Sequence, residues 1–444
     1  MSTILITVDA LRADHLAQYG YERDTMPVLD RLTEDGTIFK NAFANGPYTR
    51  ISVPSFHTST YLGYQNIESL PTIASTLAAQ NVQTVCIGTR TGFSSVEGDL
   101  HFDQYVDLGR DKYHAESEQA QPLTEKAVEK SGDILRSIPP VYRVANAVYE
   151  GVGKFGMTHF SYKGYQSAEQ VTDSAVDWLS KQQDTDFFLW LHYMEGHRPY
   201  GVHDDNPTYT DPASDEQIRH LMRTAGTEPD AVTISEHTKM IDLYDSDLRY
   251  CSQQLERLLD ELQDLNLWQE LNIIFTSDHG EEFYDHDMYY HKNLPYDELL
   301  HVPLIVRSED PAETVTEQRE LLDIAPTVLN FHGVDQPESF CGKDLFQSGR
   351  RDIIAVGSQS QEGQTVAGRE SGYKYIWTED GEFLFNLSMD SMEEQNLIDE
   401  RPEFRERFLE MIPPEILNAQ EEQLREPDNV VDQKQLEALG YLES

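Results

Sequence analysis

The segments ILITVDA (residues 4–10) and LNIIFTSDHGEE (residues 271–282) decide the fold of this chain. Each begins as a short apolar run rich in β-branched residues, which is typical of a strand buried in a sheet. The first run ends in Asp9, and the second ends in Asp278 and His279. In open α/β sheets, ligands bind beyond the carboxyl ends of the strands, so we expect these three side chains to meet at one edge of a sheet.

Strand-like and helix-like segments alternate along most of the chain. This order predicts an α/β fold, with a doubly wound, mostly parallel sheet covered by helices on both faces. The strand-like segments are 37–44, 82–88, 187–194 and 301–307, and the helical ones are 26–36, 69–81, 167–183, 321–333 and a long pattern that starts at His237.

Two regions depart from this alternation. Residues from about 104 to 165 are polar, helical in pattern and poor in strands, which indicates a helical insertion such as a lid. The segment YKYIWTEDGEFLFNLS (residues 373–388) predicts a hairpin with a turn near Asp380 and Gly381. We therefore expect a catalytic domain over 1–350, and a small C-terminal antiparallel subdomain with a hairpin and helices over 351–444.

The charge balance is strongly acidic, with 79 Asp and Glu against 34 Lys and Arg and a formal net charge of -45. The acids are spread along a chain with normal aromatic content, which indicates a folded protein with a carboxylate-rich surface rather than disorder. Such a surface needs screening cations, so we expect a halophilic protein; a basic partner or a cation store is the alternative. Nucleic acid is disfavoured as a partner, because phosphate contacts need a basic patch and none is visible.

Three scattered cysteines, the lack of a secretory signal and the lack of a long apolar run favour a cytoplasmic protein without a membrane span. The sequence leaves the oligomeric state open.

Asp9, Asp278 and His279 form a mixed oxygen and nitrogen set that suits a divalent cation. For Asp9, a helix N-cap at the strand end is the alternative. Further histidines follow the second strand, and near a metal such residues are often ligands or acid–base groups. They are His286, His291 and His301.

A hydroxyl-rich segment, NGPYTRISVPSFHTST (residues 45–60), offers a nucleophile beside such a cation. Composition does not choose among Thr49, Ser52, Ser55 and Thr58, and most of these hydroxyls are expected to be helix caps.

Four segments in order, residues 8–44, 276–306, 321–334 and 373–397, resemble the sulfatase family of the alkaline phosphatase superfamily. The resemblance covers most of the chain. It implies an alkaline phosphatase-like core, one divalent metal at the sheet edge and a covalent intermediate on the nucleophile.

Within this resemblance, Asp9 and Asp278 match metal ligands. Ala10 stands where the family often has a second Asp, and His279 stands where calcium sulfatases often carry Asn. A His there is similar to the phosphate- and phosphonate-cleaving branches, which use manganese, zinc or similar ions. The resemblance therefore implies one divalent ion, with Ca, Mg, Mn and Zn all open.

The nucleophile segment departs most from the family pattern. Aligning its S-V-P-S with the family motif puts Ser52 in the nucleophile position but replaces the motif Arg with Phe56. The alignment that begins at Thr49 keeps Pro47 upstream, and we prefer it, with Thr49 as nucleophile and fourth metal ligand. Arg90, in the altered G-K-W-H segment, either holds the substrate anion or lies on the surface.

His197 matches the family's substrate-anion His, and His291 stands where many members have an active-site Lys. The resemblance implies that His197, with Arg90, neutralises charge on the substrate and that His291 protonates the leaving group. We expect a hydrolase of sulfate or phosphate esters, phosphodiesters included, acting on small-molecule or glycan substrates. The alternatives are a phosphoryl-group transferase similar to phosphoethanolamine transferases, and a binding protein with a decayed active site.

Overall fold

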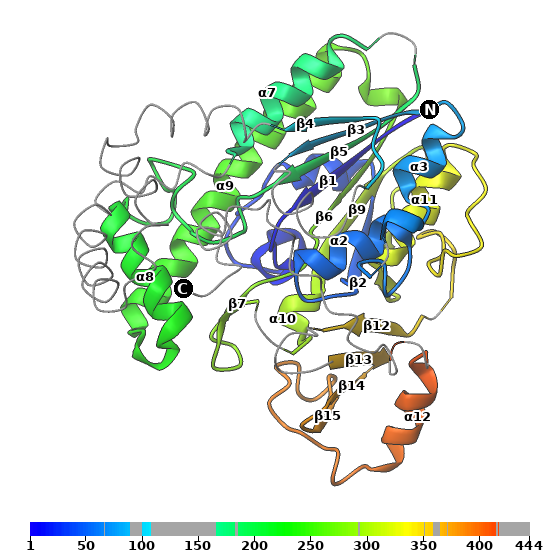
Figure 1. Ribbon diagram of the computed structural model, residues 1–444. Helices are drawn as coiled ribbons and strands as arrows, with labels where there is room; N and C mark the ends of the chain where they lie inside the picture. The colour runs from blue at the N-terminus through cyan, green and yellow to red at the C-terminus, as the bar shows by residue number, and fades with distance from the viewer. Residues whose placement is uncertain are drawn as a thin grey trace, which may run out of the picture.

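The computed structural model describes residues 1–65, 67–88, 100–107, 166–182, 185–291, 294–349, 351–357, 365–370, 372–413 and 416. A large mixed sheet lies between two layers of helices, and a small antiparallel sheet lies below it (Figure 1). The predicted α/β fold, with a mostly parallel sheet and a C-terminal antiparallel part, is confirmed.

The main sheet has nine strands among the described residues, in the order β10-β2-β9-β6-β1-β5-β3-β4, with β11 also paired to β2. Its central strand β1 runs parallel to both neighbours, β5 and β6. The strand β9 is antiparallel to β6 and to β2. The bounds are β1 Ser2–Val8, β2 Thr37–Phe43, β3 Gln83–Gly88, β4 Gln104–Asp107, β5 Phe187–Tyr193, β6 Leu271–Thr276, β9 His301–Arg307, β10 Thr314–Val315 and β11 Arg319–Glu320.

Side-chain alternation along β1 separates the two faces of the sheet. Ile4, Ile6 and Val8 belong to one core cluster, whereas Leu5 belongs to the other. Because successive strand residues point to opposite faces, Thr7 and Asp9 lie on the Leu5 face.

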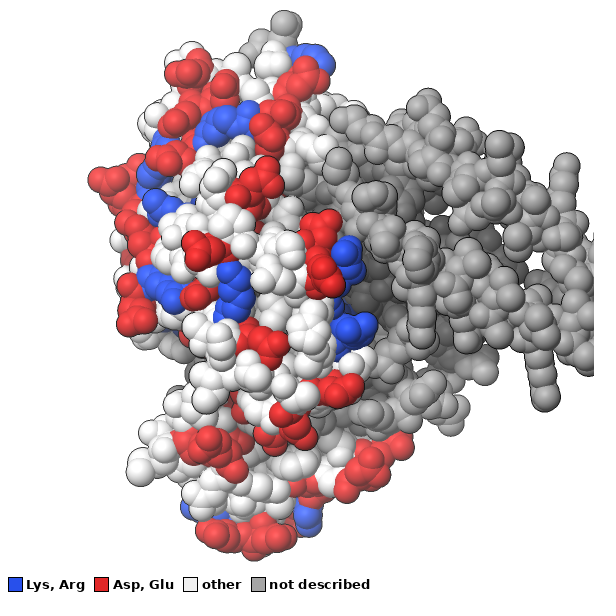
Figure 2. Space-filling view, turned by 90° about the vertical axis from the view of Figure 1, so that its left-hand side faces the viewer, with Lys and Arg blue, Asp and Glu red and all other residues white. Residues whose placement is uncertain are grey.

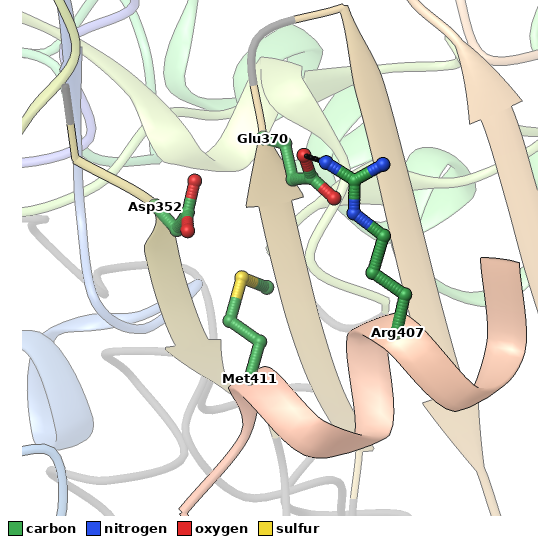
Figure 3. Close-up of a pocket in the computed structure, with 4 residues that line it drawn as sticks. All are labelled: Asp352, Glu370, Arg407 and Met411. Carbon is green, nitrogen blue, oxygen red and sulfur yellow. Dashed lines mark hydrogen bonds and ion pairs between the residues drawn. The ribbon is translucent and has the colours of Figure 1, made fainter.

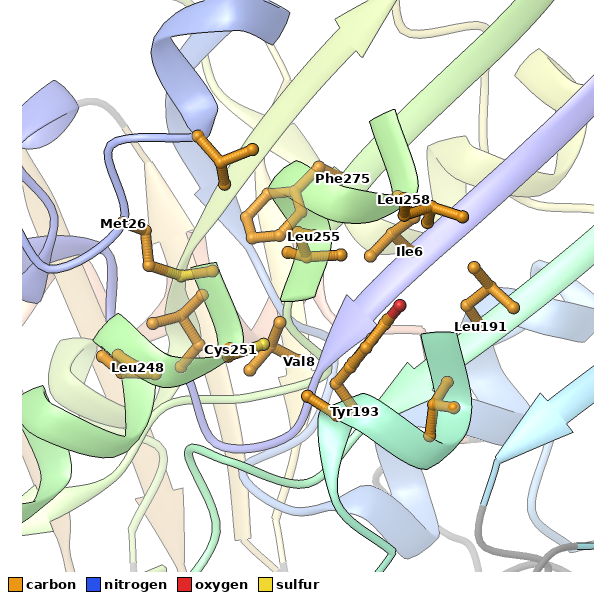
Figure 4. Close-up of a cluster of buried hydrophobic side chains, with 14 of the residues drawn as sticks. Ile6, Val8, Met26, Leu191, Tyr193, Leu248, Cys251, Leu255, Leu258 and Phe275 are labelled. Atoms are coloured by element: carbon orange, nitrogen blue, oxygen red, sulfur yellow. The ribbon is translucent and has the colours of Figure 1, made fainter. Parts of the chain in front are cut away.

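Helices α7 and α9 cover the Ile4 face, and α2, α3 and α11 cover the Leu5 face (Figure 1). Figure 4 shows side chains of α9, among them Leu248, Cys251 and Leu255, against Val8 and Phe275 of the strands. The helices are α1 Leu29–Glu34, α2 Thr49–Thr58, α3 Ile73–Ala78, α7 Ala168–Leu179, α8 Asp215–Thr227, α9 Ile234–Asp264, α10 Asp297–Leu300, α11 Ile324–Phe331 and α12 Glu403–Met411.

Short elements complete the described chain. A two-stranded ribbon joins β7 and β8, and 3₁₀ turns connect longer elements. These are β7 Glu282–Phe283, β8 Tyr289–Tyr290, and the 3₁₀ turns Ala13–His15, Ala17–Tyr19, Ile67–Ser69, Pro229–Ala231, Trp268–Glu270 and Leu321–Asp323.

The small sheet has the order β12-β13-β14-β15 and is antiparallel throughout. Its last pair is the predicted hairpin, closed by a hydrogen bond of 2.9 Å from Thr378 N to Gly381 O. Phe404 and Phe408 of α12 pack on it. The domain boundary at residue 350 stays a prediction. The strands are β12 Ile353–Val356, β13 Thr365–Glu370, β14 Tyr373–Thr378 and β15 Glu382–Asn386.

The predicted helical insertion lies largely outside the described residues. Its first four residues form the edge strand β4, which pairs in parallel with β3. Residues 108–165 are outside the description. No described helix is both long enough and apolar enough to cross a membrane.

Candidate active site

The three predicted metal ligands meet at one edge of the main sheet. Thr7 of β1 pairs with Thr276 of β6, and because the strands are parallel they deliver Asp9 and Asp278 to the same edge. One ligand atom each from Asp9, Asp278 and His279 lies within 4.8 Å of the other two, and all three residues are buried.

The donor atoms of this trio are available to a cation. Asp9 Oδ1 and Asp278 Oδ2 are buried and accept no hydrogen bond from the described residues. His279 Nδ1 donates to the Gly280 carbonyl at 2.7 Å, which leaves a lone pair on Nε2 in the neutral ring. That nitrogen is 3.6 Å from Asp9 Oδ1 and 3.6 Å from Asp278 Oδ2. Two unsatisfied carboxylate oxygens and one imidazole nitrogen therefore fit a divalent cation.

The pKa values of the two carboxylates follow from their burial and from the charges beside them. Burial, and then the charge of Asp9, raise the pKa of Asp278. Burial acts in the same direction on Asp9, but His197, His192 and His279 outweigh it and hold the pKa of Asp9 well below its usual range. Two adjacent buried acids without a cation repel each other, so a bound cation would relieve this repulsion.

The backbone at the strand ends is closely packed. Ala10 has a left-handed conformation, with φ of 55°, and its N–H donates to Asp278 Oδ1 at 3.3 Å. A Cβ on Gly196 would lie 2.2 Å from the Asp9 carbonyl, so only glycine fits there. Tyr244 of α9 donates to the Ala10 carbonyl at 2.9 Å. These contacts hold the carboxylates in one place.

Of the four candidate nucleophiles, Thr49 contacts the trio. It is the first residue of α2, and its Oγ1 lies 3.1 Å from His279 Nε2 and 3.4 Å from Asp9 Oδ2. The hydroxyls of Ser55 and Thr58 donate to backbone carbonyls. Ser52 Oγ is buried, with no hydrogen-bond partner among the described residues.

His197 and His291 also lie at the site. Their ring centroids are 5.3 Å apart, and His291 is 4.7 Å from the His279 ring. Burial lowers the pKa of His197 to about 4, with the charge of Asp9 opposing it. Its Nδ1 donates to the Arg198 carbonyl at 2.6 Å.

Two neighbours of the predicted site residues, Glu281 and His192, were not predicted from the sequence. Glu281 Oε1 is 2.9 Å from His291 Nδ1, and Tyr200 donates to Glu281 Oε2 at 2.7 Å. Burial raises the pKa of Glu281 to about 7. His192 Nε2 is 3.3 Å from Asp9 Oδ2. His192 could have been noticed in the sequence, because it is a histidine inside the otherwise apolar segment 187–194.

The remaining predicted residues lie elsewhere. His286 contacts Glu298 at 2.5 Å and stacks on Tyr296, and His301 contacts the Lys40 carbonyl at 2.9 Å. Arg90 lies outside the described residues.

A surface pocket of about 370 Å³ lies in the small sheet, apart from this site. It is lined by Asp352, Glu370, Arg407 and Met411, and Glu370 is paired with Arg407 (Figure 3). The paired Glu370 carboxylate distinguishes this pocket from the site at the main sheet, where one oxygen each of Asp9 and Asp278 has no hydrogen-bond partner among the described residues.

Comparison with known proteins shows the family of this chain. The family model described as Sulfatase matches residues 2–334. An arylsulfatase of Clostridium perfringens is 26% identical over 471 aligned positions, which cover 91% of each chain.

Solved structures share the fold. A phosphonate monoester hydrolase of Agrobacterium radiobacter superposes with a TM-score of 0.70 at 18% identity, covering 92% of this chain and 94% of that one. A protein solved with its substrate D-glucosamine-2-N,6-O-disulfate superposes with a TM-score of 0.66 at 16% identity, covering 97% and 99%. The transferase and decayed-site alternatives are not favoured. The chain belongs to the sulfatase family and is a metal-dependent hydrolase of sulfate or phosphate esters.

Proposed function

We propose that Thr49 is the nucleophile of this hydrolase, and that it shares one divalent cation with Asp9, Asp278 and His279. The observation that carries the proposal is the position of Thr49 Oγ1, 3.1 Å from His279 Nε2 and 3.4 Å from Asp9 Oδ2. Thr49 also begins α2, whose positive dipole end favours negative charge on that oxygen.

A bound divalent cation would lower the pKa of the Thr49 hydroxyl and offset negative charge on the ester oxygens. An imidazole ligand suits zinc and carboxylate ligands suit manganese, whereas calcium and magnesium are bound mainly through oxygen. Because the site has two carboxylates, one imidazole and Ala10 in place of a further acid, manganese or zinc is the proposed metal.

The chemistry needs a nucleophile and a proton donor. The Thr49 hydroxyl gives its proton to solvent, and its oxygen forms a bond to sulfur or phosphorus as the bond from that atom to the leaving ester oxygen breaks. His291, held through Nδ1 by Glu281, gives its Nε2 proton to that leaving oxygen. Water then attacks the sulfur or phosphorus as its bond to Thr49 Oγ breaks, which releases the sulfate or phosphate group; one water proton returns to Thr49, and His291 takes a proton from solvent.

His197 and Arg90 are proposed to bind the substrate anion. In the free site His197 is neutral and its Nδ1 proton is committed to the Arg198 carbonyl. An anion beside the ring favours the protonated form, so His197 would take up a proton at Nε2 as the substrate binds. Arg90 would add a second positive charge.

The substrate class is proposed from the relatives. They include an arylsulfatase and a protein bound to a disulfated glucosamine, and the structural neighbours include phosphonate monoester hydrolases. We therefore propose sulfate or phosphate esters of small molecules or glycans, phosphodiesters included.

The test compares two hydroxyls three residues apart on one helix. Thr49→Ala is expected to lower turnover of an aryl sulfate, phosphate or phosphodiester by about 10³-fold or more, because it removes the nucleophile. Ser52→Ala is the matched control and should keep turnover close to that of the wild type. Mass spectrometry of acid-quenched enzyme should find one sulfate or phosphate group on Thr49.

An adduct on Ser52, or a Thr49→Ala variant with wild-type turnover, would contradict the assignment. Thermal unfolding of both variants shows whether the fold has survived the change, and the manganese affinity of Ser52→Ala, which keeps all the proposed ligands, should equal that of the wild type.

The acidic surface supports a proposal about conditions. Figure 2 shows one face of the molecule, on which acidic side chains outnumber basic ones over the described residues. With a net charge of -45, the folded state repels itself unless salt screens it. We propose that the protein works in the salt-rich cytoplasm of a halophile, and that its melting temperature rises with KCl concentration. A flat salt dependence would contradict this.

A further inference from the structure

The neighbour of Asp9 that the sequence did not predict lies in a row of four side chains. His192 pairs in register with Thr7 across β5 and β1. Trp190 lies two residues before His192, and Asp9 lies two residues after Thr7. Because strand side chains alternate, all four belong to the same face of the sheet. His192 and Asp9 are each only 1% exposed.

Hydrogen bonds run along this row in one direction. Trp190 Nε1, which can only donate, lies 2.9 Å from Thr7 Oγ1. The single hydroxyl proton of Thr7 has two acceptors within reach, His192 Nδ1 at 2.8 Å and the Leu191 carbonyl at 3.4 Å. The shorter contact takes the proton, so Nδ1 of His192 is an acceptor.

These hydrogen bonds determine which tautomer of His192 faces Asp9. A neutral His192 that accepts at Nδ1 carries its proton on Nε2, which lies 3.3 Å from Asp9 Oδ2. That oxygen is thereby occupied, and Asp9 Oδ1 is the carboxylate oxygen without a hydrogen bond among the described residues. Oδ1 is also the oxygen 3.6 Å from His279 Nε2.

We infer that His192 is a positioning residue of the cation site: held by Trp190 and Thr7, it donates from Nε2 to Asp9 Oδ2 and presents Oδ1 to the metal. The inference rests on the proposed cation site. Groups that orient a ligand in this way contribute about 10- to 100-fold to metal affinity.

The structure provides a matched control in His57. It is also fully buried and lies 4.5 Å from the same Trp190 ring. Neither ring nitrogen of His57 has a hydrogen-bond partner among the described residues, and burial lowers its pKa to about 3. Replacing His57 therefore removes a buried imidazole beside Trp190 but leaves the contact between His192 and Asp9 in place.

Calorimetric titration of the full chain with Mn²⁺ tests the inference. His192→Phe keeps a ring but loses the donor, and should bind Mn²⁺ about 10- to 100-fold more weakly. His192→Gln, which keeps an N–H near the position of Nε2, should recover most of the affinity. His57→Phe should bind like the wild type.

Nitrogen-15 spectra of the histidine-labelled, metal-free protein give a second readout. The signals that disappear in His192→Phe should belong to a neutral ring protonated at Nε2. If His192→Phe does not fold, Thr7→Val, which removes the hydroxyl and keeps the shape, should weaken Mn²⁺ binding and change that tautomer.

Wild-type Mn²⁺ affinity in His192→Phe, or a ring protonated at Nδ1, would overturn the inference and leave the proposed cation site intact. A wild-type chain that binds no divalent cation would instead overturn the proposed site.

Discussion

Two groups of buried or partly buried acids in this molecule are neutralised in opposite ways. At the edge of the main sheet, Asp9 and Asp278 lie together with histidines, and each has a carboxylate oxygen that no described residue satisfies. Below it, Asp297 of α10 and Glu393 share Lys374 of β14, whose Nζ is 2.9 Å from both carboxylates.

The second group, which we call the lysine cluster, consists of Asp297, Glu393, Lys374 and Arg369. Arg369 of β13 adds a further ion pair of 2.9 Å to Asp297. Burial acts to raise the pKa of Asp297, but Lys374 and Arg369 hold it well below its usual range. The lysine cluster joins the small sheet to α10 with cations that the chain itself supplies.

The difference separates structural acids from functional ones. Both groups remove carboxylates from water, which is costly unless a cation lies beside them. In the lysine cluster that cation is covalently part of the chain. At the proposed cation site it would be bound from solution, so its charge would be available to the substrate as well.

The largest expected effect is the loss of stability when the cation of the lysine cluster, Lys374, is removed. Lys374→Met takes a cation from the buried Glu393 carboxylate and the partly buried Asp297 carboxylate, and should lower the free energy of unfolding by about 3–5 kcal/mol. Lys181→Met is the control, because Lys181 pairs with Asp177 on the surface, with both side chains about two-thirds exposed; it should cost no more than about 0.5 kcal/mol. Urea denaturation measures both, and equal losses would show that the lysine cluster is not structural.

The next effect is the loss of turnover when Asp278 of the proposed cation site is neutralised. Asp278→Asn should lower turnover about 10²- to 10³-fold and abolish Mn²⁺ binding. Without metal it should not lower the free energy of unfolding, because it removes a charge that repels Asp9. Asp260→Asn, in an exposed pair with Arg31, is the control for activity. Wild-type turnover in Asp278→Asn would contradict the proposed role of Asp278 as a metal ligand.

Adding a metal ion should have the opposite effect to Lys374→Met, because it supplies a cation to buried acids instead of removing one. Mn²⁺ at 100 times its dissociation constant should raise the free energy of unfolding of the wild type by about 2.7 kcal/mol. Lys374→Met should gain the same amount, because its cation site is intact, and Asp278→Asn should gain none. Thermal or urea unfolding with and without Mn²⁺ measures the three gains. A gain in Asp278→Asn would place the stabilising cation elsewhere.

The effect of pH on the lysine cluster is the smallest of the four for a change of one pH unit. Burial raises the pKa of Glu393 from its usual value of 4.5 to about 7, with Lys374 opposing and Asp297 assisting. Its contribution to stability is thus fully present below the unfolded pKa and is lost as pH rises through the folded one. Over that window, stability should fall by up to about 1.4 kcal/mol per pH unit. Glu393→Gln should flatten this slope in urea denaturation between about pH 5 and pH 7; an unchanged slope would mean that other groups cause it.

Much of the fold could be predicted because apolar runs with a period of two or 3.6 residues specify strands and helices locally. The hairpin at 373–388 and the strand of residues 4–8 followed this rule. The direction of β9 did not, because its sequence, HVPLIVR, is equally apolar in a parallel or an antiparallel strand. Residues 104–107 were assigned to an insertion, since four residues carry too little periodicity to identify an edge strand.

The sequence by itself determined that Asp9, Asp278 and His279 end two buried strands, since the apolar runs before them require burial and parallel strands end at one edge. Only the tertiary structure decided which other groups reach that edge. The β1–β5 register brought His192 and Thr7 beside Asp9, and the start of α2 brought Thr49 to it. The folding of the chain after His279 brought Glu281 to His291, and took His286 and His301 to other partners. Contacts between residues far apart in the chain depend on register and packing, which no local pattern encodes.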